Sequence, residues 1–143
     1  FRCANSGVDA SNVPGDKVVA LLPEDPDASA ERLRQDIRER TGAQVAVVVS
    51  DTFGRPWREG ATNVAIGVAG LAPLKDYRCQ RDSHGHLLRT TVIAIADELA
   101  AAAELVTDKV TGIPAAVIRG YSFTPGKGRA RNLLREPSLD LFP

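Results

Sequence analysis

The stretch Gln44–Gly60, QVAVVVSDTFGRPWREG, decides how the chain is organised, because it joins a strongly apolar segment to a dense polar one. Gln44–Ser50 is rich in β-branched residues and almost entirely apolar, which predicts a strand covered on both faces. Asp51–Gly60 follows at once, and active sites of α/β proteins lie in such loops beyond the carboxyl ends of strands. The sequence therefore predicts a functional site at this strand end.

The side chains of Asp51–Gly60 suit a site for a metal ion and a phosphate. Asp51 and Thr52 offer hard oxygen ligands of the kind that Mg²⁺ and Mn²⁺ take. Arg55 and Arg58 offer guanidinium groups that bind phosphate or carboxylate. The alternative interpretation is structural: Asp51 caps a turn, Trp57 packs against the fold, and both arginines stay in solvent.

Hydrophobic periodicity and capping residues predict the other elements of the chain. A helix is expected over Ser29–Thr41, capped by Ser29 and stopped by Gly42. A second helix is expected over Thr90–Val106, buried on most sides, with its carboxylates Asp97 and Glu98 paired with arginines rather than catalytic. Further strands are predicted over Asp16–Leu22, Asn63–Val68 and Ala115–Arg119, and a short helix near Asn132–Arg135. This alternation indicates an α/β or α+β fold without fixing the strand order.

Composition narrows the class of protein. The chain has 143 residues, which corresponds to one domain or a large part of one. Lys plus Arg and Asp plus Glu both number 18, so a non-specific binder of nucleic acid or of anionic membranes is not expected. No apolar run approaches the ~20 residues of a membrane span. Two cysteines, Cys3 and Cys79, without a CxxC pair favour a cytoplasmic protein with reduced thiols. The chain contains no methionine and starts at Phe1, so we expect it to begin inside a longer protein.

Two other polar clusters have competing interpretations. Asn5–Asn12, NSGVDASN, brings Asp9, Ser11 and Asn12 within four residues of one another, which fits either a tight turn or a ligand site. Asp76–His86 contains two histidines beside acidic residues, and a surface turn is favoured over a transition-metal site there.

Three segments together resemble the coenzyme F420-0:L-glutamate ligase family. They are ANSGVDASN at Ala4–Asn12, SDTFGRPWREG and VAIGVAG within Ser50–Gly70, and ADELAAAAELV and IPAAVIRG within Ala96–Gly120. The resemblance extends in order over essentially the whole chain. It implies an α+β fold particular to the family, with a mixed sheet, packed helices and an intertwined homodimer. It also implies that residues 1–143 are the C-terminal part of a single ligase domain, without the nitroreductase-like flavin domain that some relatives carry.

The resemblance further implies an activity and a set of cofactors. The family adds L-glutamate to the deazaflavin precursor F420-0, splits GTP to GDP and phosphate, and requires Mg²⁺ or Mn²⁺, with K⁺ as a further expected cation. By position, Asp9 and Asp51 resemble ligands of a first metal ion, and Thr52 resembles a ligand of a second. The residues expected near the nucleotide are Asn12, Asp108, Lys109 and Gly112. From chemistry alone, Arg55 and Arg58 are assigned to stabilise charge on the transferred phosphoryl group or to hold the substrate carboxylates.

The chain also departs from the family pattern. Lys109 stands where an acidic metal ligand is usual, which puts the second metal site in question, and Asp108 is the residue that would substitute. Cys79 stands where a glycine is usual, so a positive φ there would strain the cysteine. The resemblance also implies that the family's N-terminal portion precedes the residues of this chain. Two alternatives therefore stay open: a catalytically incomplete fragment that dimerises and binds metal, and a related amide ligase for another small carboxylate.

Overall fold

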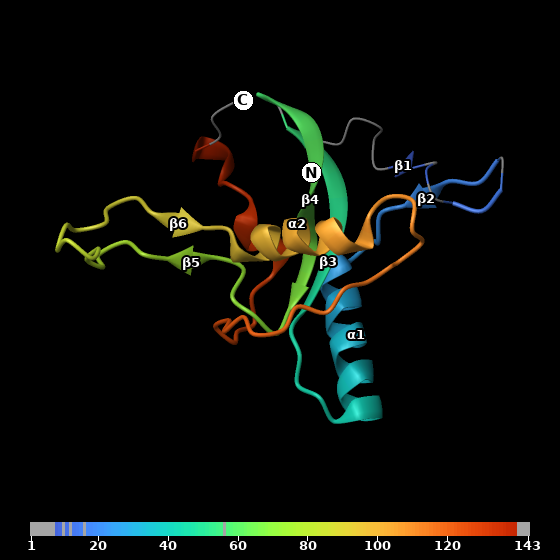
Figure 1. The fold of residues 1–143 in the computed structure, drawn as a ribbon, viewed down its shortest axis with the longest axis horizontal. Coiled ribbons are helices and arrows are strands. Elements are labelled where there is room, and N and C mark those ends of the chain that lie inside the picture. Colours follow the sequence, from blue (N-terminus) through green and yellow to red (C-terminus); the bar gives the residue numbers. More distant parts are fainter. Residues whose placement is uncertain (1–7, 10, 12, 16, 56, 140–143) are drawn as a thin grey trace.

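The computed structural model describes residues 8–9, 11, 13–15, 17–55 and 57–139, and these residues form an α+β fold (Figure 1). The strands are β1 (Val8–Asp9), β2 (Ala20–Leu21), β3 (Val47–Arg55), β4 (Arg58–Ala69), β5 (Lys75–Asp76) and β6 (Val92–Ile93). The helices are α1 (Pro26–Thr41) and α2 (Ile95–Thr107), with 3₁₀ turns η1 (Ala130–Leu133) and η2 (Pro137–Leu139). Within the described residues every strand pair is antiparallel, namely β1–β2, β3–β4 and β5–β6. The expected α+β class is confirmed, whereas the expected mixed sheet is not what these strands form.

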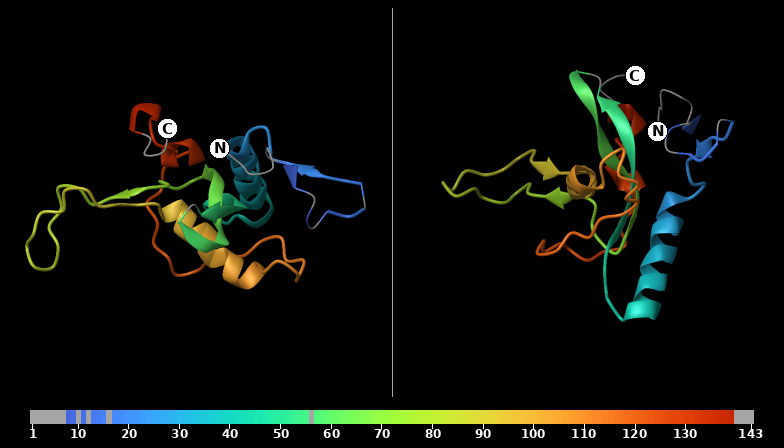
Figure 2. Two further views of the ribbon diagram at one scale, coloured as in Figure 1. Left: turned by 90° about the horizontal axis from the view of Figure 1, so that it is seen from above. Right: turned by 45° about the vertical axis from the view of Figure 1, so that its right-hand side comes forward.

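The centre of the molecule is the long β3–β4 ribbon, with α1 on one face and α2 on the other (Figure 2). Its register runs from Val47 opposite Ala69 to Arg55 opposite Arg58, with irregularities between Val49 and Ser50 and between Phe53 and Arg55. The prediction of a loop over Asp51–Gly60 is therefore wrong. The strand continues because Thr52 and Phe53 are themselves good strand residues, and the chain reverses only between Arg55 and Arg58.

The buried strand of the ribbon is β4, not β3. Residues Ala65–Ala69 are all buried, whereas β3 is only half-buried, so the prediction of a strand covered on both faces fails for Gln44–Ser50. Small apolar side chains dominate the core because two helices pack on a ribbon of only two strands. The core cluster consists of Ala65, Val68, Leu71, Ile95, Ala96 and Ala130.

Gly67 lets α1 approach β4 closely. A Cβ atom on Gly67 would lie 2.3 Å from the carbonyl oxygen of Pro26, the first residue of α1. The strand continues through this glycine to Ala69. The absence of a side chain therefore serves the contact between helix and strand.

The helix boundaries differ from the expected ones at their N-terminal ends. Asp25, rather than Ser29, caps α1, because its Oδ1 accepts a hydrogen bond from the Ala28 N–H at 2.9 Å, and Pro26 fills the first helical position. Gly42 ends α1 in the left-handed conformation, with φ 71°, as predicted. α2 begins only at Ile95, because the residues just before it form β6.

Three helix carboxylates satisfy backbone N–H groups of β4 that β3 does not take. The pairs are Asn63 with Glu104 at 2.8 Å, Ala65 with Asp97 at 2.9 Å and Val68 with Asp27 at 2.8 Å. Asp97 was expected to pair with an arginine within the core or across a dimer. Among the described residues of this chain it pairs with the Ala65 N–H instead, and a pairing across a dimer stays a prediction. The backbone N–H groups at a strand edge without a neighbouring strand need hydrogen-bond acceptors, and Asp97 of α2 is the acceptor for Ala65 of β4.

Much of the chain lies on extended arms rather than in a compact body (Figure 1). The accessible surface is 11123 Å² for 15.2 kDa, whereas a compact monomer of this mass exposes about 7,100 Å². The predicted strand Asp16–Leu22 is seen only as Ala20–Leu21, with Leu21 72% exposed rather than buried. Ala115–Arg119 forms no strand with any described residue, and Val117 is 78% exposed. In the described residues, no helix is both long and apolar enough to cross a bilayer.

Candidate active site

An open cavity of about 450 Å³ lies along β3 and is lined by β1, β2, the middle of β3 and Lys109. It brings together three segments that are far apart in the sequence. Asp9 comes from β1, Asp51 and Thr52 come from β3, and Lys109 comes from the loop after α2. The structure thus gathers four of the predicted site residues around one cavity.

Both candidate metal-binding carboxylates are held by local hydrogen bonds. Asp9 accepts from the Ser11 N–H at 2.8 Å and from the Ser11 hydroxyl at 2.9 Å. Asp51 accepts from the Thr52 N–H at 2.8 Å. In the described ranges no group of three or more His, Cys, Asp or Glu side chains could hold a metal ion. Two carboxylates fit Mg²⁺, which usually takes one or two carboxylates and completes its shell with water and substrate phosphates.

The Thr52 hydroxyl contacts one residue of β4 and one residue of the loop after α2. It donates to Asn63 Oδ1 at 2.8 Å and accepts from Lys109 Nζ at 3.1 Å. Asn63 stands directly opposite Thr52 in the β3–β4 register. Sequence reasoning missed Asn63, because only the hairpin register brings it to the site.

The two arginines lie at the end of the hairpin rather than around the main cavity. They line a neighbouring hollow, which shares Gly54 with the cavity. Arg55 donates to the carbonyl oxygens of Glu59 at 2.6 Å and Gly60 at 3.1 Å, so its guanidinium holds the turn. Arg58 stands opposite Arg55 in the register and is exposed. Their assignment to catalysis stays a prediction.

The remaining predicted nucleotide contacts are placed in different ways. Asn12 lies outside the described residues. Asp108 ends α2 with φ 53°, and its carboxylate accepts from the Lys109 N–H. Gly112 has φ 68° and is exposed. Of the three residues from this loop, only Lys109 lines the cavity.

The arm between β5 and β6 holds the polar cluster of Asp76–His86 away from the cavity (Figure 1). Asp82 accepts from the backbone N–H groups of His84 at 2.9 Å and His86 at 2.8 Å, as a turn residue does. Cys79 has φ 65°, which confirms that this position takes the conformation typical of glycine.

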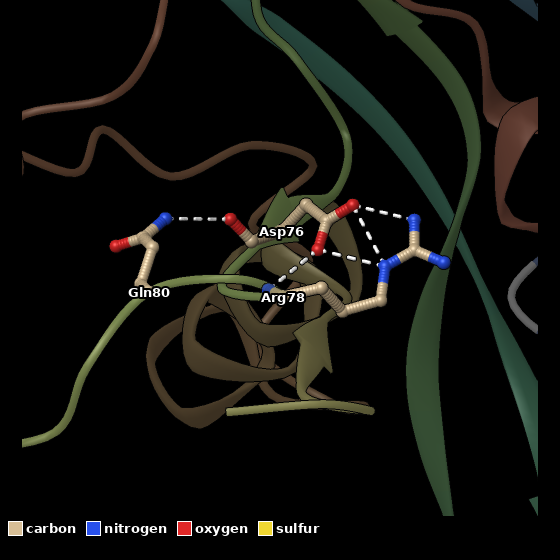
Figure 3. A network of polar contacts seen from close by, with 3 residues as sticks. All are labelled: Asp76, Arg78 and Gln80. Carbon is tan, nitrogen blue, oxygen red and sulfur yellow. Dashed lines mark hydrogen bonds and ion pairs between the residues drawn. The ribbon is translucent and has the colours of Figure 1, made fainter. Parts of the chain in front are cut away.

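Asp76 and Arg78 form the best-aligned ion pair on that arm (Figure 3). Arg78 Nε lies 2.9 Å from both carboxylate oxygens, and the Arg78 N–H also donates to Oδ1 at 2.8 Å. Hydrogen bonds from Arg78 lower the pKa of Asp76 to about 2. Gln80 adds a bond to the Asp76 carbonyl oxygen at 2.9 Å, so the network stiffens the base of the arm.

Carboxylates, a hydroxyl and a lysine around one open cavity define a site suited to bind an anion beside a hard cation. Comparison with known proteins shows to which family a chain with this site belongs. Residues 1–120 match the family model described as F420-0:Gamma-glutamyl ligase. The chain belongs to this family.

Several similar proteins carry the name of one enzyme. The coenzyme F420:L-glutamate ligase of Methanothermobacter thermautotrophicus is 50% identical over 145 aligned residues, which cover 99% of this chain and 57% of that protein. The protein of the same name from Methanocaldococcus jannaschii is 46% identical, again over 99% of this chain and 57% of its own length. The one from Haloarcula marismortui is 49% identical over 96% of this chain and 53% of its own length. The chain thus spans a little more than half the length of these curated relatives.

Proposed function

We propose that this chain carries the metal and nucleotide-phosphate part of a ligase that attaches L-glutamate to coenzyme F420-0 at the expense of GTP. The observation that carries the proposal is that Asp9, Asp51 and Lys109 line one cavity. It is supported by the 50% sequence identity between this chain and a protein named coenzyme F420:L-glutamate ligase. The cavity volume of about 450 Å³ suits part of a nucleotide.

The chemistry of amide formation explains why such a site is needed. A carboxylate oxygen of F420-0 attacks the γ-phosphorus of GTP, the bond to the β-phosphate oxygen breaks, and GDP leaves. The amine nitrogen of glutamate then attacks the acyl carbon, inorganic phosphate leaves, and the nitrogen gives its proton to a base. Mg²⁺ or Mn²⁺ held by Asp9 and Asp51 would neutralise charge on the phosphates.

Arg55 and Arg58 extend this proposal toward the carboxylates of the substrates. Both residues flank the hollow that adjoins the cavity at Gly54. The bonds from Arg55 to the Glu59 and Gly60 carbonyls fix the direction of its guanidinium. A fixed guanidinium loses little entropy when a carboxylate binds to it. We assign the two arginines to substrate carboxylates or to the transferred phosphoryl group.

The oligomeric state and the cellular compartment of the enzyme are part of the same proposal. The accessible surface exceeds that of a compact monomer by more than half. Leu105 and Val110, at the end of α2 and in the loop after it, are 86% and 88% exposed. Such exposed apolar side chains support association with a second copy or with another part of a longer protein. We propose a homodimer that works in the cytoplasm on small molecules.

The proposal is tested by metal-dependent nucleotide binding to the full-length protein. Calorimetric titration with GDP is expected to show binding in the presence of Mn²⁺ and loss of at least tenfold in affinity for Asp51→Asn. Asp36→Asn, an exposed change on α1, is the matched control and keeps wild-type affinity. Mass spectrometry of F420-0 incubated with glutamate and GTP then detects the glutamylated product. Equal GDP affinity with Mn²⁺ and with a chelator would contradict the proposal.

A further inference from the structure

The side chain of Lys109 contacts the hydroxyl of Thr52 on β3. Its Nζ donates to Thr52 Oγ1 at 3.1 Å, although the residues lie 57 positions apart in the sequence. Lys109 follows the end of α2, where Asp108 takes φ 53° and turns the chain. Of the described residues that line the cavity, Lys109 is the only basic one, and within the described chain it forms no ion pair.

The orientation of the Thr52 hydroxyl is fixed by β4. Its single proton goes to Asn63 Oδ1 at 2.8 Å, so the oxygen offers only lone pairs toward Lys109. Asn63 is itself anchored, because its N–H donates to Glu104 of α2 at 2.8 Å. The oxygen that points at Lys109 is therefore preorganised to face a cation.

A divalent ion on Thr52 does not fit these residues. Such an ion would lie about 2.0–2.6 Å from its oxygen ligand, on the side where the Lys109 ammonium lies at 3.1 Å. Two cations at such a separation repel each other strongly. At the predicted second metal position beside Thr52, the Lys109 ammonium therefore already supplies a positive charge.

We propose that the Lys109 ammonium takes the place of a second metal ion beside Thr52 and binds phosphate oxygens of the nucleotide in the cavity. One of its three donors is used on Thr52, which leaves two for phosphate. The site then holds one divalent ion at Asp9 and Asp51 and one lysine cation. This inference rests on the proposed function for the nature of the phosphate ligand.

The first test counts bound manganese. Electron paramagnetic resonance of the full-length protein, titrated with Mn²⁺ in the presence of GDP, is expected to show one tightly bound ion per chain. Lys109→Glu, which exchanges the cation for a carboxylate next to Thr52, is expected to bind a second ion. Two ions bound to the wild-type chain, or a single ion bound to Lys109→Glu, would overturn the proposal.

The second test needs no metal. With a chelator present, calorimetric titration with inorganic pyrophosphate is expected to show about tenfold weaker binding to Lys109→Gln, and near wild-type binding to Lys109→Arg. Lys75→Gln, an exposed lysine on the β5–β6 arm, is the matched control and is expected to change nothing. Equal affinities of the wild type and Lys109→Gln would overturn the role of the lysine.

The two tests separate this inference from the proposed function. If no manganese binds to the wild type, the metal site of the proposed function fails, and the pyrophosphate titration still decides the role of Lys109. If manganese and GDP bind as expected but Lys109→Gln and Lys109→Glu behave as the wild type, only the inference about Lys109 fails.

Discussion

The Asp27 carboxylate of α1 accepts a hydrogen bond from the backbone N–H of Val68 on β4 at 2.8 Å. The same oxygen also accepts from the Ala130 N–H of η1 at 2.9 Å, so one side chain joins three elements of the fold. Asp27→Ala leaves two partly buried donors without an acceptor, and we expect the free energy of unfolding to fall by about 1–3 kcal/mol. Urea denaturation measures this loss. Asp36→Ala, exposed on the same helix, should change it little, and equal losses for both variants would contradict the role of Asp27.

Gly67→Ala is expected to push α1 away from β4. The added methyl group would stand 2.3 Å from the Pro26 carbonyl oxygen, and the backbone on both sides must move. We expect a loss of about 1–3 kcal/mol in stability, measured by thermal and urea unfolding. Gly54→Ala is the control, because its Cβ would meet nothing within 4 Å. A Gly67→Ala protein as stable as Gly54→Ala would show that the contact is not tight.

Cys79→Gly is expected to give a more stable protein than Cys79→Ala. The backbone at this position has φ 65°, a conformation that costs side chains about 1–2 kcal/mol and that glycine adopts freely. Cysteine and alanine share this strain, so the comparison of the two variants removes the effect of losing the thiol. We expect a difference of about 1 kcal/mol in chemical denaturation. The reverse order of stability would show that the turn is not strained.

Asp76 is expected to stay ionised to lower pH than an ordinary aspartate. Its pKa in the folded protein is about 2, below the ordinary 3.8, because Arg78 hydrogen-bonds to the carboxylate. The pair therefore stabilises the fold above about pH 4, and this contribution is lost as the pH falls from 3.8 toward 2. Carbon-13 NMR titration of the carboxyl group measures the midpoint.

Arg78→Gln should return that midpoint toward 3.8. Arg81→Gln, on the same arm but bonded to the Gly85 carbonyl oxygen, should leave it unchanged. A midpoint near the ordinary value in the wild type would contradict the ion pair.

Candidate site residues could be named from the sequence, but the elements that surround them could not. Asp51 and Thr52 stand out because they offer oxygen ligands directly after an apolar strand, whereas Asp9 was named through the family resemblance. Their roles stay predictions. What spacing could not show is that Asp51 and Thr52 lie inside a strand, since the segment contains Gly54 and two arginines that suggest a loop. A hairpin register is a long-range property, so Asn63 could not be assigned as the partner of Thr52.

The helices could be predicted because capping and periodicity are local properties of the sequence. The burial of the strands could not be predicted in this way. Gly42 ends α1 as its type requires, because a left-handed cap is decided by one residue. Burial depends on what packs where: α1 and α2 cover Ala65–Ala69 of β4, whereas the more apolar Gln44–Ser50 stays half-covered. The acceptor role of Asp97 likewise depends on where α2 crosses the ribbon.

The helix carboxylates of Asp27, Asp97 and Glu104, which bind N–H groups of β4, also determine at which edge another strand can pair with the ribbon. They occupy N–H groups that an incoming strand would need, and they place negative charge along that edge. Strand addition at β4, the usual first step of edge-to-edge aggregation, is therefore blocked by the chain itself. Any further strand would have to join at the other edge of the ribbon, which belongs to β3, the strand that carries Asp51 and Thr52.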